Sequence, residues 1–111
     1  MLKLTRNQAI KFGRKGLKAL NYELPGIENG SSVIYNEATG EHGQRTIGNR
    51  ARIYYVIEGE GEFIVNGKKF SVAAGDVIPI APQSTYNYFA GKKTLKLILF
   101  MELLDVTKLP R

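Results

Sequence analysis

Two arginines and three tyrosines are the residues of this sequence whose side chains could form a chemical site together. Arg50 and Arg52 lie two residues apart, Tyr54 follows at the same spacing, and Tyr86 and Tyr88 repeat it. Residues at this spacing point to one face of a β-strand. Guanidinium groups and phenol hydroxyls on one face suit a small carboxylate, sugar or phosphate. The structural alternative is that the tyrosine rings fill a core and the arginines pair with acids or reach solvent.

The other groups with reactive chemistry are few. The sequence has one histidine, His42, and no cysteine. His42 lies in a Gly-Glu-His-Gly segment, which predicts a solvent-exposed loop histidine, since neither a metal site nor a general base is complete without further groups. The partners that an inward-pointing Arg52 could find are Glu37, Glu41, Glu102 or a tyrosine hydroxyl.

Short strands must position these residues. Segments rich in β-branched and aromatic residues alternate with turn residues, and this pattern predicts an all-β sandwich or barrel. Asn66-Gly67 is the favoured sequence of a type I′ hairpin turn. Thr5 and Gln8 have the spacing of a helix capping box, which predicts one short helix ending near Lys11. The strands are expected over residues 17–24, 33–37, 52–58, 62–65, 68–72, 77–80, 86–89 and 95–101.

Length and composition indicate one soluble domain. The chain has 111 residues, 43% of them hydrophobic, which is enough for a single core. The absence of cysteine excludes a disulfide framework and is compatible with the cytoplasm, the localisation that we expect. The longest apolar run, residues 95–104, contains Lys96 and Glu102 and is too short to span a membrane.

The positive charge is concentrated near the N-terminus. The net charge is +6, and residues 1–25 hold six basic residues against Glu23 alone. No nucleic-acid-binding motif accompanies this charge, and charge alone supports only non-specific binding. We therefore expect residues 1–25 to be a helix and strand segment that packs on the body through interleaved apolar residues, with no specific nucleic-acid partner.

From Arg52 onward the sequence resembles a small single-domain cupin. The string RIYYVIEGEGEF begins at Arg52, Asn66-Gly67 follows, and GDVIPIAP over residues 75–82 precedes Tyr86. The resemblance covers about residues 40–101. It implies a double-stranded β-helix, or jelly-roll barrel, which with the short N-terminal helix makes residues 1–111 one domain.

The same resemblance bears on metal binding. Cupins with a catalytic metal usually carry a His-x-His pair and a Glu in the first motif, and a His in the second. Here Arg52 stands at the Glu position, Tyr86 stands at the second His position, and the His-x-His positions fall within Arg45-Thr46-Ile47-Gly48. A guanidinium in place of a carboxylate repels a metal cation. The resemblance therefore implies a metal-less cupin without a cofactor, in which Arg52 and Tyr54 point into the barrel.

Two main functions remain open from the sequence. The first is metal-independent binding of a small polar or anionic molecule in the barrel, at Arg52, Tyr54, Tyr86, Tyr88 and Arg50. The alternative is a metal-free sugar or keto-acid isomerase or epimerase. One histidine and no inward carboxylate pair make a poor acid–base set, which favours binding without catalytic residues. A regulatory relative of ligand-sensing domains is less favoured, because no DNA-binding helices are present.

The face of the strand opposite Arg52 and Tyr54 predicts self-association. Ile53, Tyr55 and Ile57 make this face apolar as well. A strand that is apolar on both faces is normally covered on both. We expect a homodimer that buries this face.

Overall fold

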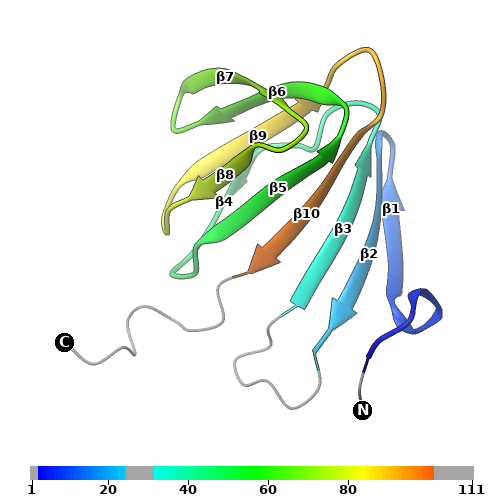
Figure 1. Ribbon diagram of the computed structural model, residues 1–111. Helices are drawn as coiled ribbons and strands as arrows, with labels where there is room; N and C mark the ends of the chain where they lie inside the picture. The colour runs from blue at the N-terminus through cyan, green and yellow to red at the C-terminus, as the bar shows by residue number, and fades with distance from the viewer. Residues whose placement is uncertain (1–2, 25–31, 102–111) are drawn as a thin grey trace.

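The computed structural model describes residues 3–24 and 32–101, which form a sandwich of two antiparallel sheets (Figure 1). The six-stranded sheet has the order β1 (Ile10–Arg14), β2 (Leu17–Glu23), β3 (Ser32–Ala38), β10 (Leu95–Met101), β5 (Arg52–Glu58) and β8 (Val77–Ile80). The four-stranded sheet has the order β4 (Arg45–Thr46), β9 (Thr85–Ala90), β6 (Glu60–Val65) and β7 (Lys68–Ala73). The all-β prediction is confirmed. The sandwich is open rather than a closed barrel, because no ladder joins the two sheets among the described strands.

The strands follow the local sequence pattern closely. Each expected strand occurs with its ends within two residues of the prediction. Asn66 and Gly67 have φ values of 48° and 83°, so both central positions of the β6–β7 turn lie in the left-handed region that this dipeptide tolerates.

The N-terminal segment differs from its prediction. The expected helix to Lys11 is a single three-residue 3₁₀ turn, η1 (Arg6–Gln8), and β1 begins at Ile10. The capping residues do meet, since the Thr5 backbone N–H donates to Gln8 Oε1 at 2.8 Å. One helical turn is marginal by itself, whereas β1 gains a full ladder by pairing with β2. Within the described residues no helix approaches the length of a membrane span.

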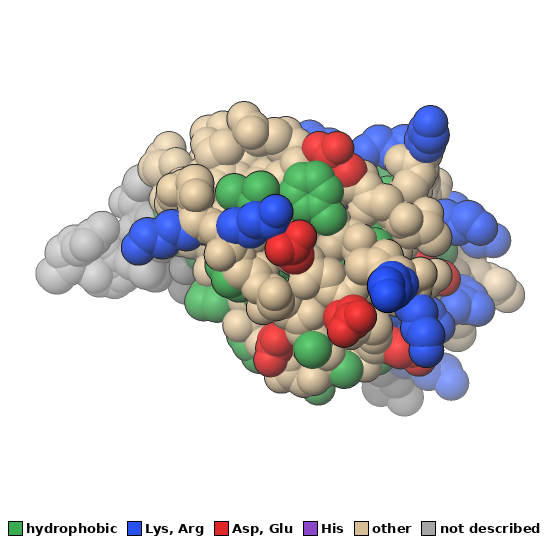
Figure 2. Space-filling model, turned by 90° about the horizontal axis from the view of Figure 1, so that it is seen from above, with side chains coloured by type: hydrophobic (Ala, Val, Ile, Leu, Met, Phe, Trp, Pro, Cys, Tyr) green, Lys and Arg blue, Asp and Glu red, His purple; other side chains and the backbone are tan. Residues whose placement is uncertain are grey.

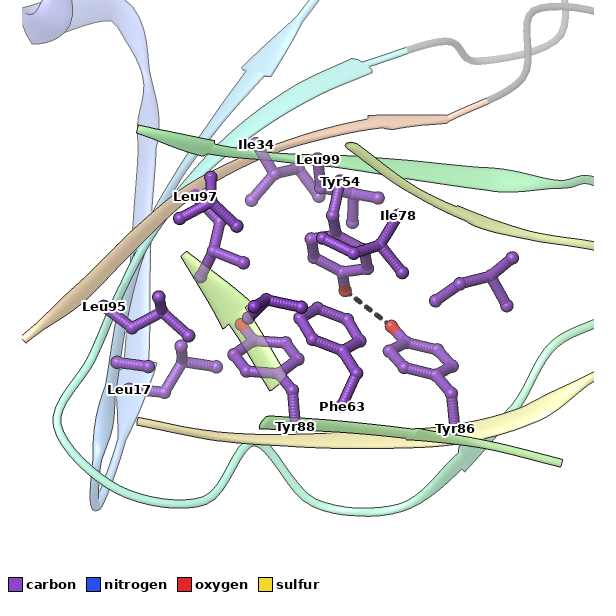
Figure 3. Packing of buried hydrophobic residues seen from close by; sticks show 14 of the residues in the cluster. Leu17, Ile34, Tyr54, Phe63, Ile78, Tyr86, Tyr88, Leu95, Leu97 and Leu99 are labelled. Atoms are coloured by element: carbon purple, nitrogen blue, oxygen red, sulfur yellow. Dashed lines mark hydrogen bonds between the residues drawn. The ribbon is translucent and has the colours of Figure 1, made fainter. Parts of the chain in front are cut away.

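The core lies between the two sheets and is filled largely by aromatic and branched aliphatic side chains (Figure 3). Along β5, Tyr54 and Val56 are buried, whereas Ile53, Tyr55 and Ile57 are about two-fifths exposed on the outer face. Along β10, Leu95, Leu97 and Leu99 point inward. Strand alternation thus carries Tyr54 from the six-stranded sheet toward the rings of the four-stranded sheet.

The dimer expectation stays a prediction, and Tyr55→Glu tests it. Ile53, Tyr55 and Ile57 share the outer face with Val77 and Phe100, all of them exposed in the single chain. A carboxylate placed in this patch would have to be desolvated in a dimer, so the variant should be monomeric or insoluble. Light scattering measures the mass, and Lys68→Glu on the other sheet is the control. A stable monomer of the unchanged chain at high concentration would contradict the prediction.

Candidate functional site

Three buried tyrosines meet between the sheets. Tyr54 comes from β5, whereas Tyr86 and Tyr88 lie two residues apart on β9, and each is at most 1% exposed. The hydroxyl oxygens of Tyr54 and Tyr86 are 2.6 Å apart (Figure 3). All three tyrosines therefore point into the core, as expected, and they come from both sheets.

Arg52 extends this hydrogen-bonded chain toward solvent. Its Nη1 donates to the Tyr86 hydroxyl at 2.7 Å, and its guanidinium carbon lies 5.8 Å from the centre of the Tyr86 ring. The side chain is half-buried. Within residues 3–24 and 32–101 its partner is a neutral hydroxyl and not a carboxylate, because the ion pairs there join Lys69 to Glu62 and Lys96 to Glu58.

Of the three acids expected to pair with Arg52, Glu37 lies on β3 opposite Lys96 and Lys18, and the other two are engaged elsewhere or lie outside the description. Glu41 accepts a hydrogen bond from Asn87 Nδ2 at 2.7 Å, and Glu102 falls outside the described residues. Arg50 precedes β5, which begins at Arg52, so strand alternation does not place the two arginines on one face as expected. They nevertheless border the same hollow of about 360 Å³ beside Ile47 and Met101.

The prediction of a solvent-exposed His42 is wrong. Its side chain is buried and its ring stacks on two tyrosines, with centroid distances of 4.6 Å to Tyr88 and 5.5 Å to Tyr86. The polar segment that carries it runs beside β9, where the His42 backbone N–H donates to the Tyr88 carbonyl at 2.8 Å and Ala90 donates to the Gly40 carbonyl. This backbone pairing, which local composition does not encode, brings the histidine ring against the buried rings of Tyr86 and Tyr88.

Asn87 and Arg14 hold this loop in place. Asn87 Oδ1 accepts from the backbone N–H of Gly43 at 2.8 Å, and its amide nitrogen bonds Glu41. Arg14, from the end of β1, donates to the His42 carbonyl. Arg14, Glu41 and His42 also border a hollow of about 520 Å³. Neither Arg14 nor Asn87 could be assigned to the site from the sequence, since nothing in their local sequence distinguishes them.

The environment of His42 makes it a neutral base at physiological pH. Its Nδ1 lies 2.8 Å from the Gly43 carbonyl oxygen, which can only accept, so Nδ1 carries the proton and Nε2 presents a lone pair. Burial lowers the pKa of His42 to about 4, and the positive charges of Arg14, Arg45 and Arg52 act in the same direction. The hydrogen bond to Gly43 opposes this shift without cancelling it.

The Tyr88 hydroxyl has no partner within residues 3–24 and 32–101. Its oxygen is buried and forms no hydrogen bond with any of these residues, although the Tyr88 ring stacks on Phe63 at 4.9 Å as well as on His42. Burial raises the pKa of Tyr88, and it raises that of Tyr54 as well, so both hydroxyls keep their protons at neutral pH. A buried hydroxyl normally finds a partner, and this one has none among the described residues.

The side chains at this site do not fit a metal. Among the described residues no three His, Cys, Asp or Glu side chains are grouped. The positions that the resemblance assigns to metal ligands include Arg45, which lies opposite Tyr86 in the β4–β9 ladder, and Arg52, which donates to the Tyr86 hydroxyl. Guanidinium groups neither donate electron pairs to a cation nor tolerate one nearby.

The family of the chain follows from its sequence. Residues 33–101 match the model of the cupin domain. This chain belongs to the cupin family. No curated protein sequence matches it.

Solved cupin structures resemble this chain in fold. Pac13 from Streptomyces, a nucleoside dehydratase, superposes with a TM-score of 0.81 at 20% identity, over 92% of this chain and 82% of that one. A predicted oxalate decarboxylase from Thermotoga maritima gives a TM-score of 0.74 at 21% identity, over 93% and 100% of the two chains. The cupin domain of Cnp3 from Schizosaccharomyces pombe gives 0.76 at 16% identity, over 96% and 77%. At these identities the likeness shows the fold alone.

Three further Pac13 structures are of substituted proteins with uridine. One has a histidine replaced by glutamine, and two have a tyrosine replaced by phenylalanine. Histidine and tyrosine are also the residue types that this cupin brings together between its sheets at His42, Tyr54, Tyr86 and Tyr88.

Proposed function

We propose that this cupin is a metal-independent enzyme that binds a small polar molecule of the nucleoside class and transfers protons on it. The observation that carries the proposal is His42, which is unprotonated at neutral pH and stacks on Tyr88, whose hydroxyl has no partner. A base and a proton donor side by side in a low-dielectric interior are the two groups that acid–base catalysis needs.

The proposed reaction is the elimination of water. The lone pair of His42 Nε2 accepts a proton from a carbon next to a carbonyl group, and the electrons of that C–H bond form a carbon–carbon double bond. The hydroxyl group on the adjacent carbon leaves with a proton from a tyrosine hydroxyl and departs as water. The proton on His42 then returns to the tyrosinate, directly or through solvent, so the enzyme ends unchanged. An isomerase would use the same base but return the proton to another atom.

The spacing of residues supports this proposal. The two substituted tyrosines of Pac13 are separated by the same number of residues as Tyr54 and Tyr88 here. Its substituted histidine precedes the first of them by one residue more than His42 precedes Tyr54. This cupin therefore has a candidate residue for each of the three substituted Pac13 positions.

Binding without catalysis is the second candidate function, and Arg52 favours it. A half-buried guanidinium whose hydrogen-bond partner is a neutral hydroxyl is suited to an anionic or polar ligand. A histidine with a pKa near 4 is also a weak base. In that case the tyrosines and Arg52 orient a ligand that leaves unchanged.

Hydrogen exchange on bound carbonyl compounds distinguishes the two candidates. Uridine binding is measured by ligand-detected NMR, and a panel of hydroxyaldehydes and hydroxyketones, including oxidised nucleosides, is incubated with the protein in D₂O. We expect deuterium incorporation or loss of water, slowed by about 10²–10⁴-fold in Tyr88→Phe and His42→Gln. Both variants should still bind uridine.

Stability measurements complete this test. Tyr88→Phe removes a buried hydroxyl that has no partner, so the unliganded protein should be as stable as before or more stable by about 1 kcal/mol. Tyr55→Phe on the outer face is the matched control and should change neither exchange nor stability. If uridine binds but no panel compound exchanges hydrogen, the enzymatic proposal is wrong and the binding function remains.

A further inference from the structure

The peptide group that joins His42 to Gly43 is held at both ends by side chains from distant strands. Arg14 at the end of β1 donates to its carbonyl oxygen, and its N–H donates to Asn87 Oδ1 at 2.8 Å. The backbone groups on either side are also bonded, because the His42 N–H donates to the Tyr88 carbonyl and the Gly43 carbonyl oxygen lies 2.8 Å from His42 Nδ1. This peptide group therefore has little freedom to turn.

The conformation of Gly43 makes the last of these bonds possible. Its φ is 103°, in a region that other residues rarely adopt. Space is not the reason for glycine, since the nearest described atom to a Cβ built there is Arg14 Nη2, at an ordinary contact distance of 3.6 Å. With this backbone angle Gly43 presents its N–H to Asn87 and its carbonyl oxygen to the ring of the preceding histidine.

Asn87 connects the histidine loop to the strand that carries the buried tyrosines. It precedes Tyr88 on β9 and is itself buried. Its Oδ1 accepts from the backbone N–H groups of Gly43 and Tyr88, each at 2.8 Å, which uses both lone pairs of that oxygen. Its Nδ2 donates to Glu41 Oε2 at 2.7 Å. One side chain thus fixes the backbone beside His42 relative to that of Tyr88.

We infer that Asn87 and Arg14 are positioning residues that keep the proton of His42 on Nδ1. They hold the His42–Gly43 peptide group, and this keeps the Gly43 carbonyl oxygen at Nδ1. The hydrogen bond of one ring nitrogen decides which tautomer a neutral histidine adopts. Without this acceptor the proton can move to Nε2 and remove the lone pair that a base needs. The catalytic consequence rests on the proposed function, whereas the tautomer is a property of the unliganded protein.

The tautomer can be measured without ambiguity, because His42 is the one histidine in the sequence. A long-range proton–nitrogen NMR spectrum of the unliganded protein should show a protonated Nδ1 at neutral pH. In Asn87→Ala we expect a shift toward the Nε2–H form and an about 10²-fold slower deuterium incorporation into the panel compounds, with uridine still bound. Asn36→Ala removes another buried amide, which donates to the Ile34 carbonyl, and should change neither.

A double variant distinguishes positioning from the mere loss of a buried amide. Asn87→Asp alone places a second carboxylate within hydrogen-bond distance of Glu41, and the two repel each other. Adding Glu41→Gln reverses donor and acceptor between these two side chains and restores the original net charge. The new carboxylate can still accept from Gly43, so the double variant should regain the Nδ1–H tautomer and most of the exchange that Asn87→Asp loses.

Arg14→Gln releases the other end of the same peptide group without a change in the core. Arg14 is exposed, and Lys and Arg side chains gather along one side of the end of the sandwich that carries the β1–β2 turn (Figure 2), so the loss of one charge there should be tolerated. The tautomer should shift in the same direction as in Asn87→Ala. Lys15→Gln, at the next position, is the control with the same change of charge.

The tautomer and the exchange rate separate the possible failures. A tautomer that is unchanged in every folded protein among Asn87→Ala, Asn87→Asp and Arg14→Gln would overturn the inference and leave the proposed function standing. A shifted tautomer, with no exchange on any compound by the unchanged chain, would support the role of these residues in setting the tautomer and overturn the enzymatic function. A protonated Nε2 in the unchanged chain would overturn both.

Discussion

Deletion of residues 1–23 is expected to leave the rest of the chain unfolded at room temperature. The basic N-terminal segment supplies the two strands at one edge of the six-stranded sheet and is not a tail. β2 pairs with β3 along its full length, and β1 pairs with β2. Leu17 and Ala19 of β2 are buried in the core. Losing one buried leucine costs about 2–5 kcal/mol, and the lost ladder adds roughly 1 kcal/mol per hydrogen bond. The sum is comparable with the whole stability of a small domain, about 5–15 kcal/mol.

Circular dichroism melting measures this effect. A full-length chain with Lys11, Lys15 and Lys18 changed to Gln is the control, since it loses charge from exposed side chains but keeps both strands, and should melt near the unchanged protein. A truncated chain that melts normally but no longer shows salt-sensitive binding to mixed-sequence DNA would contradict the prediction and make the segment a nucleic-acid arm.

His42→Gln is expected to remove a large part of the pH dependence of stability. In the unfolded chain His42 takes up a proton near pH 6.5, whereas in the folded protein its pKa is about 4. Between these values the unfolded state binds more protons, so the free energy of unfolding falls as pH falls through this window and is fully recovered above it. The pKa difference corresponds to about 2–3 kcal/mol at the acid end.

Urea denaturation near pH 7 and near pH 4.5 tests this prediction. The carboxylates titrate in both proteins. The free energy of unfolding that each protein loses between the two pH values therefore differs only by the contribution of His42. The glutamine variant should lose less stability on acidification than the unchanged chain, because glutamine has no proton to gain. An equal loss of unfolding free energy in the two proteins would show that His42 is solvated. It would also remove the observation on which the proposed enzyme rests.

Strand positions and inward-facing tyrosines were predictable because they depend on local periodicity. Side chains alternate along any strand, so Tyr54 and Val56 had to face opposite to Ile53 and Tyr55 once a strand was assigned. The Asn66-Gly67 turn follows from the backbone angles that these two residues tolerate. Burial of the tyrosine rings follows from the same alternation together with the cupin resemblance.

Only the tertiary structure decided the environment of His42 and the hydrogen-bond partners of Arg14 and Arg52. Locally the sequence around His42 reads as a polar glycine loop, but its neighbours bond Asn87, more than forty residues away. Similarly, η1 and β1 replace the expected longer helix, because pairing with β2 outweighs one capped helical turn. Arg14, Arg45 and Arg52 come from three strands whose relative placement no local pattern specifies. Contacts between distant segments are set by the packing of whole sheets, and this packing turns separate polar residues into one candidate site.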